Sequence, residues 1–335
     1  MEGHVLNTWG GGSSQLDHRS SRLQALDDRV KLLKHLSIDD STRSGYGTGY
    51  RSYLRFCNNF DLPLNPTPLT LARYIAYTSQ SIASGPKYLS GAKHFLQDQF
   101  PDFSRSRSSP LVKSVIAGSK KLRADAVHRK APLRMFHLQQ FLSKFSSRDS
   151  YDDLLFLTIL SCAFYACHRI GELIVRSPGK VDLRKVIRRS SILFPDSGHV
   201  SYWLPFHKGD RFFRGTEILL GPQKILDPVS LLRQYTALRD AKFGARLPLF
   251  ICNDGSLPSR SWFESRFFSL LTHEFGGHSL RAGGATFYAS LGLSETVIQA
   301  LGRWSSDSWK IYIRDNPSIR AEIELANIQR RSSSH

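Results

Sequence analysis

Residues 152–173 have the sequence DDLLFLTILSCAFYACHRIGEL, and this stretch decides the fold of the second half of the chain. Its apolar run is broken only by Thr158 and Ser161 and is too short to span a membrane, so we expect a buried helix. Arg169 follows that helix directly, and Glu172 stands three residues later. Because a buried arginine needs a charged partner or a bound anion, Arg169 is a candidate functional residue.

The net charge of the chain favours a polyanionic partner. Its 335 residues include 46 Lys and Arg against 28 Asp and Glu, which gives a formal charge of +18. Nucleic acid is the leading partner for such a basic chain, whereas the absence of a spanning apolar run argues against a membrane. A chain of this length fits two domains, each with its own core.

The N-terminal segment has no apolar stretch of signal-peptide length, which indicates a reducing compartment. The chain has four cysteines, namely Cys57, Cys162, Cys167 and Cys252. Two of them precede His168 in a Cys-x4-Cys-His pattern that could bind a metal. This trio lies in an apolar segment without a second pair of ligands nearby, so we interpret it as core packing and expect no metal site.

Composition and helix signals divide the chain into four parts. Residues 1–20 are rich in Gly and Ser and indicate a disordered tail, while residues 21–126 carry helical signals throughout and predict an all-helical domain. Residues 127–132 predict an exposed linker, because Pro132 disfavours helix at the residue before it. Residues 133–335 combine helices with alternating segments. The expected fold is mostly α-helical with a small antiparallel sheet.

The last helix of the first domain is notably basic, and the linker that follows adds two more cations. These side chains could contact the phosphates of DNA, and a solvated charged face explains the helix equally well. The candidate DNA-binding residues are Lys113, Lys120, Lys121, Arg123, Arg129 and Lys130.

Three short alternating segments predict the sheet of the second domain, at residues 192–194, 200–204 and 216–220. Pro195-Asp196-Ser197-Gly198 supplies the first turn and His207-Lys208-Gly209-Asp210 the second. We therefore expect an antiparallel meander with Lys208 at a mobile hairpin tip.

The C-terminal part holds a cluster of chemically active residue types. His278 and Arg281 lie one turn apart on a predicted helix, so both can face the same phosphate. Gly302-Arg303-Trp304 ends a later helix, and the next helix carries Tyr312, eight residues beyond Trp304. Taken alone, His278 and Arg281 are explained by a basic helix surface, and Trp304 and Tyr312 are explained by packing. Only their order and spacing together indicate a site.

The order of these residues resembles the tyrosine recombinases, also called the phage integrase family. The resemblance covers roughly residues 154–314 and includes the phrases HSLRAGGAT and LGRWSSDSWKIYIR. The sequence of these segments looks most similar to recombinase-like proteins of eukaryotic mobile elements. The resemblance implies an all-helical core-binding domain, with which the N-terminal helices are compatible, and a mixed α/β catalytic domain.

The resemblance also implies a role for each residue of the site. Arg169 and Arg281 would clamp the scissile phosphate, Tyr312 would attack it, and Lys208 would protonate the departing 5′ oxygen. His278 would assist proton transfer, Trp304 would donate its indole N–H to the phosphate, and Glu172 would orient its neighbours. Guanidinium groups that stabilise the charge of the phosphoryl group replace a metal, so no metal and no cofactor are expected.

The implied function is site-specific recombination of double-stranded DNA through a 3′-phosphotyrosyl intermediate, without metal or ATP. It further implies a homotetramer on paired sites, in which residues 319–328 either dock onto a neighbouring subunit or fold back onto their own chain. The expected location is the nucleus in a eukaryotic host and otherwise the cytoplasm, with the chromosome.

Several alternatives stay open. The chain could be a catalytically inactive, transposon-derived DNA-binding regulator, or a topoisomerase of the same chemistry. Lys224 could replace Lys208, and Tyr288 could replace Tyr312 as a poorer nucleophile. The helix pair 282–290 and 295–301 resembles a helix-turn-helix, although the recombinase interpretation makes it a scaffold.

Overall fold

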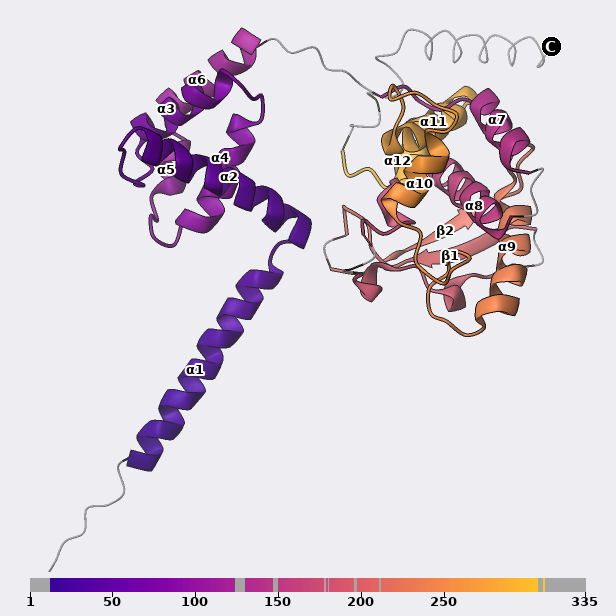
Figure 1. The fold of residues 1–335 in the computed structure, drawn as a ribbon, viewed down its shortest axis with the longest axis horizontal. Helices are drawn as coiled ribbons and strands as arrows, with labels where there is room; N and C mark the ends of the chain where they lie inside the picture. Colours follow the sequence, from indigo (N-terminus) through magenta and orange to yellow (C-terminus); the bar gives the residue numbers. More distant parts are fainter. Residues whose placement is uncertain are drawn as a thin grey trace, which may run out of the picture. The chain divides into compact units, whose positions relative to one another are not determined.

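The computed structural model describes residues 13–123, 130–146, 150–177, 179, 181–195, 198–210, 212–306 and 310, with side chains from residue 21 onward. The chain divides into two compact units, Met1–Val127 and His128–His335, and each is described by itself (Figure 1). The division falls within the segment expected as a linker.

The N-terminal unit is helical throughout its described secondary structure. Its helices are α1 (Ser13–Leu36), α2 (Asp40–Asn59), α3 (Pro68–Ser79), α4 (Gly85–Leu96), α5 (Phe103–Arg107) and α6 (Pro110–Arg123). Helix α1 begins inside residues 1–20, which we expected to be a disordered tail. No Gly or Pro occurs from residue 13 to residue 44, so nothing in the sequence interrupts a helix there. The apolar residues Leu26, Val30 and Leu33 of α1 are exposed.

The core of this unit forms where α2, α3 and α4 meet, around Tyr53, Leu71 and Leu89. Glycine allows the closest approach between α2 and α4. A Cβ atom added at Gly49 would lie 2.5 Å from the carbonyl oxygen of Tyr88 on α4. The two helices therefore pack backbone against backbone at this point.

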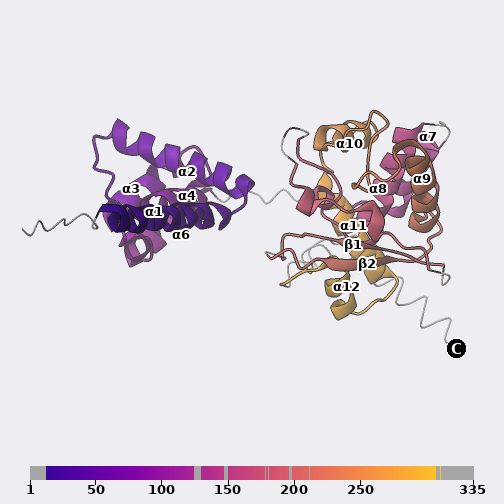
Figure 2. The ribbon, with the colours of Figure 1, turned by 90° about the horizontal axis from the view of Figure 1, so that it is seen from below.

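The C-terminal unit combines helices with one β-hairpin. Its helices are α7 (Met135–Phe145), α8 (Tyr151–Tyr165), α9 (Pro228–Phe243), α10 (Arg260–Phe267), α11 (Gly277–Ser290) and α12 (Glu295–Gly302), with 3-10 turns at Ile170–Glu172, Leu183–Lys185 and Arg189–Ser191. Every residue from 155 to 165 of α8 is buried. The buried face of the hairpin joins α8 and α9 in one core (Figure 2).

The sheet contains two strands in the described residues, β1 (Val200–Leu204) and β2 (Thr216–Leu220), paired antiparallel with Val200 opposite Leu220. The expected fold class, mostly α-helical with a small antiparallel sheet, is confirmed. The expected third strand at residues 192–194 is wrong, because that segment makes only an isolated bridge between Leu193 and Ser201. Pro195 follows it and has no N–H to continue the ladder.

Among the described residues, no helix combines the length and the apolar character that crossing a membrane requires.

Two glycines of α2 provide a matched test of the α2–α4 contact. We predict that Gly49→Ala lowers the free energy of unfolding of the chain by about 1–3 kcal/mol, because its Cβ would push against the backbone of α4. Gly45→Ala should instead raise it by about 0.5–1 kcal/mol, because no atom lies within 4 Å of a Cβ there and alanine favours helix. Denaturant unfolding measures both, and equal effects would contradict the close packing at Gly49.

Candidate active site

Three segments of the C-terminal unit meet at one buried arginine, Arg281 on α11. Its Nη1 donates a 2.6 Å hydrogen bond to the carbonyl oxygen of Cys167, just after α8, and its Nη2 donates to the carbonyl oxygen of Gly302, at the end of α12. The guanidinium also lies 4.0 Å from the centre of the Trp304 ring. Burial and the nearby charge of Arg169 lower the pKa of Arg281 to about 10, so it stays charged at neutral pH.

Glycine brings α11 against α8. A Cβ at Gly284 would collide with the carbonyl oxygen of Phe164, and Gly283 faces the backbone of Leu133 in the same way. Residues 279–286 of α11 are buried as a result. Helix α11 therefore forms part of the core, as the scaffold interpretation expects, whereas residues 295–297 and 300 of α12 are exposed.

Arg169 stands beside this centre and is held by Glu172. Its Nη1 donates to Glu172 Oε1 at 3.2 Å, and its backbone N–H donates to Oε2 at 3.2 Å. The Arg169 side chain keeps 27% of its surface exposed, whereas Glu172 keeps 6%. Arg169 can therefore still reach a ligand while one carboxylate oxygen fixes its orientation.

Glu172 belongs to a buried network that our sequence analysis did not identify. His168 Nδ1 lies 2.8 Å from Glu172 Oε2, and His168 Nε2 lies 2.8 Å from the hydroxyl oxygen of Tyr202 on β1. Arg303 Nη2 donates to the same carboxylate oxygen at 3.1 Å. His168 had been interpreted as core packing, and its burial agrees with that. The only sequence signal for Arg303 was its place after Gly302 at a helix end.

The protonation states in this network follow from burial and charge. Burial and the charge of Arg303 lower the pKa of His168 to about 4, so the ring is neutral at pH 7. Burial opposes ionisation of Glu172, but the His168 hydrogen bond and the charge of Arg303 hold its pKa well below the usual range. We therefore assign a donating Nδ1–H to His168, with Nε2 accepting from Tyr202.

His278 and Lys208 occupy the solvent side of the site. His278 lies in the first turn of α11 and Lys208 in the turn between β1 and β2, and both are exposed. Partial desolvation, followed by the charges of Arg169, Arg281 and Lys208, lowers the pKa of His278. Three neighbouring cations, Arg169, Arg281 and Lys208, therefore act on His278.

The remaining site residues are placed as follows. Trp304 is buried against Arg281. Tyr288 donates its hydroxyl to the carbonyl oxygen of Tyr165 at 2.8 Å, and burial raises its pKa, both of which disfavour it as a nucleophile. Lys224 is exposed between β2 and α9. Tyr312 and residues 319–328 lie outside the described residues; Lys310, two residues before Tyr312, forms a 3.4 Å ion pair with Glu295 of α12.

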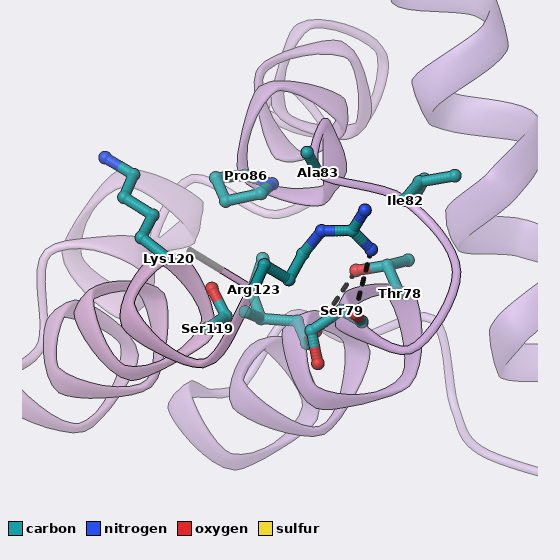
Figure 3. Close-up of a pocket in the computed structure, with 9 residues that line it drawn as sticks. Thr78, Ser79, Ile82, Ala83, Pro86, Ser119, Lys120 and Arg123 are labelled. Carbon is teal, nitrogen blue, oxygen red and sulfur yellow. Dashed lines mark hydrogen bonds between the residues drawn. The ribbon is translucent and has the colours of Figure 1, made fainter. Parts of the chain in front are cut away.

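The basic candidates of the N-terminal unit differ in their surroundings. Lys113, Lys120 and Lys121 are exposed on α6. Arg123 instead points into a small pocket beside Thr78 and donates a 3.2 Å hydrogen bond to the carbonyl oxygen of Ser79, so it ties α6 to the end of α3 (Figure 3). In the C-terminal unit, Lys130 donates to the carbonyl oxygen of His273, and Arg129 lies outside the described residues.

No cluster of three or more His, Cys, Asp or Glu side chains is arranged to hold a metal ion in the part of the chain that the structure describes.

Comparison with known proteins shows the fold. No protein-family model matches the chain, and no curated protein does. Solved structures that are similar to the chain include the following three. The XerH site-specific recombinase in a post-cleavage complex with palindromic difH substrate is 17% identical, with a TM-score of 0.51 over 79% of this chain and 72% of that one. A lambda integrase tetramer bound to a Holliday junction is 17% identical, with a TM-score of 0.51 over 90% of this chain and 84% of that one.

The third similar structure is the Tn1549 transposon integrase in complex with circular intermediate DNA. It is 14% identical, with a TM-score of 0.52 over 84% of this chain and 92% of that one. The chain therefore has the fold of these recombinases and integrases.

The lowered pKa of His168 predicts a pH dependence of stability. The unfolded chain binds a proton at His168 near pH 6.5 and the folded chain only near pH 4, so this residue makes unfolding easier as pH falls through that window. We expect this residue to lower the free energy of unfolding by about 2 kcal/mol between pH 7 and pH 5.

Urea unfolding of wild type and His168→Gln at both pH values measures this contribution. It is the difference between the two proteins in the slope of the free energy of unfolding against pH. The slope should be shallower in the variant, whereas His273→Gln, which changes an exposed ring, should keep the wild-type slope. Equal slopes in all three proteins would show that His168 is not buried in its neutral form.

Proposed function

We propose that this chain is a tyrosine-type, site-specific DNA recombinase, which cleaves and rejoins DNA strands through a 3′-phosphotyrosyl bond to Tyr312 without metal or ATP. One observation carries the proposal most directly. Arg281 donates a hydrogen bond to the carbonyl oxygen of Cys167, two residues before Arg169, so two arginines from distant parts of the sequence lie close together. Burial, followed by the charge of Arg169, lowers the pKa of Arg281. Glu172 bonds to Arg169 and offsets only one of the two charges, and a phosphate supplies a second anion.

The geometry of the two arginines suits a phosphodiester. The partly exposed guanidinium of Arg169 can donate hydrogen bonds to the non-bridging oxygens, and the buried guanidinium of Arg281 supplies a fixed positive charge beside it. Arg281 uses two of its five N–H groups for backbone carbonyls, and no described carboxylate hydrogen-bonds to it. Such fixed donors stabilise the charge that builds up on these oxygens during phosphoryl transfer, which is usually the largest single contribution to catalysis.

The remaining residues account for the protons. The phenolic oxygen of Tyr312 forms a bond to phosphorus as the bond to the 5′ oxygen breaks. The lowered pKa of His278 keeps its ring neutral near pH 7, so it can accept the tyrosine proton. Lys208 gives a proton to the departing 5′ oxygen. The phosphotyrosine keeps the energy of the broken bond, so a 5′ hydroxyl of another strand reverses the reaction without ATP.

The similar structures support the choice of partner. The XerH, lambda and Tn1549 proteins are all seen with DNA, and the lambda integrase is seen as a tetramer on a Holliday junction. We extend double-stranded DNA and a homotetramer on paired sites to this chain. We further propose that the protein belongs to a mobile element and acts at a chromosomal target. Its location is then the nucleus in a eukaryotic host and otherwise the cytoplasm.

The nucleophile is tested by trapping the covalent intermediate. Purified protein is mixed with a random-sequence library of nicked duplexes, denatured, and assayed for DNA bound covalently to protein. We expect an adduct with wild type and none with Tyr312→Phe, because phenylalanine has no oxygen to attack phosphorus. The matched control is Tyr288→Phe, which removes a hydroxyl engaged with Tyr165 and should keep the adduct.

Other outcomes point to the alternatives. Salt-sensitive DNA binding without an adduct would favour the inactive, transposon-derived regulator. An adduct together with relaxation of any supercoiled plasmid, and with no joining of two DNAs, would favour a topoisomerase.

The exposed lysines of α6 provide a test of the DNA-binding surface. Replacing Lys113, Lys120 and Lys121 together by alanine should reduce the slope of log affinity against log salt by about 3, because each phosphate contact contributes about 0.9. The control replaces Lys31, Lys144 and Lys242, whose ammonium groups already have partners in the protein. Fluorescence anisotropy with a labelled duplex measures both slopes, and an equal loss in the control would exclude α6 as a specific contact surface.

A further inference from the structure

The residue Arg303 adopts a backbone conformation that favours glycine. It caps α12 with a φ of +54°, in the left-handed region. A non-glycine residue there costs roughly 1–2 kcal/mol, and glycine is the usual residue at such a helix end. The interactions of the Arg303 side chain must therefore offset this backbone cost.

The side chain of Arg303 is almost completely buried and reaches three separate segments. Its Nη1 donates to the carbonyl oxygens of Ala166, at the end of α8, and Leu301 at 3.3 and 3.1 Å. Its Nη2 lies 3.1 Å from both Glu172 Oε2 and His168 Nδ1. Both N–H groups of Nη1 and one of Nη2 are taken by these partners, so Arg303 has little left to donate to a DNA phosphate.

These contacts divide the carboxylate of Glu172 between two arginines. Oε1 accepts from the side chain of Arg169, and Oε2 accepts from Arg303 and from His168. Without Arg303, Arg169 would be the only cation bonded to this buried carboxylate, whose charge would compete with a phosphate for the Arg169 guanidinium. Arg303 offsets this charge and leaves Arg169 positioned but available.

We propose that Arg303 is a positioning residue, which neutralises Glu172 so that Arg169 is oriented for the scissile phosphate, and which holds the end of α12 beside Arg281. This inference rests on the proposed function. The sequence indicated a role for the neighbouring Trp304 and none for Arg303. The contact with His168 adds a spectroscopic signature, because burial and then the charge of Arg303 keep that ring neutral.

The decisive variants are Arg303→Gly and Arg303→Lys. Glycine suits the left-handed backbone and removes only the side chain, so the fold should persist. Lysine restores the charge without the planar fork. The matched control is Arg189→Met, which breaks an arginine–carboxylate pair with Asp240 elsewhere in the same unit.

Two measurements follow. The first is the rate of adduct formation with a nicked duplex selected from the random library, alongside the affinity for the same duplex. We expect Arg303→Gly to lower the rate about 100-fold, the effect typical of a misplaced reacting group, with affinity changed less than about 3-fold. Arg303→Lys should recover part of the rate, and Arg189→Met should keep the wild-type rate.

The second measurement is an NMR titration of the His168 ring, which needs no DNA. In Arg303→Gly the pKa of His168 should rise from its depressed wild-type value, because a nearby positive charge is gone while burial of the ring remains. An unchanged rate, or an unchanged His168 titration, in a folded Arg303→Gly protein would overturn the inference. If wild type itself forms no adduct, the proposed function fails, and the titration still decides whether Arg303 sets the charge of the Glu172–His168 pair.

Discussion

The C-terminal unit depends on the burial of one charged group, the guanidinium of Arg281. A buried charge is stable only where fixed dipoles or counter-charges compensate it. Here the compensation comes from the carbonyl oxygens after α8 and at the end of α12, two segments far apart in the sequence. These carbonyls converge only when α8, α11 and α12 have packed together, and glycine at position 284 makes that packing possible. The site is therefore a product of the complete fold and not of any single motif.

The balance of charge around Arg281 explains why the site would attract an anion. Glu172 is the carboxylate that bonds to Arg169 and Arg303, while His168 is neutral at pH 7. Three guanidinium groups thus face one carboxylate among these residues, which leaves an excess of positive charge. Because Arg281 and Arg303 are enclosed, this charge acts in a medium that screens it weakly. A phosphate at Arg169 would gain more from such an arrangement than from the exposed lysines of α6.

Much of this architecture was predictable from the sequence, because the signals were local. The apolar run before Arg169 predicted α8, the alternation on each side of Lys208 predicted the hairpin, and His278 and Arg281 were placed on the helix that is α11. One failure was local, because Pro195 directly follows the expected third strand and has no N–H to continue it. Other failures depended on contacts between distant residues: Arg123 makes a contact to Ser79 that no local pattern reveals. Arg303 escaped notice for the same reason, since its partners Glu172 and His168 lie in another part of the chain.

The described residues of the site fall into two groups with different physical requirements. Under the proposed function, the stabilisation that Arg169 and Arg281 would give to a phosphate depends steeply on distance and orientation, and both side chains are held by hydrogen bonds to buried groups. A proton carrier needs only to reach its oxygen at the moment of transfer, and Lys208 and His278 stand in a turn and in a first helical turn, both exposed to solvent. Asp210 shapes that turn through its hydrogen bonds with the backbone N–H groups of residues 212 and 215, without restraining the lysine side chain. Folding thus fixes the charges that hold the phosphate, while bound DNA would order the groups that move protons.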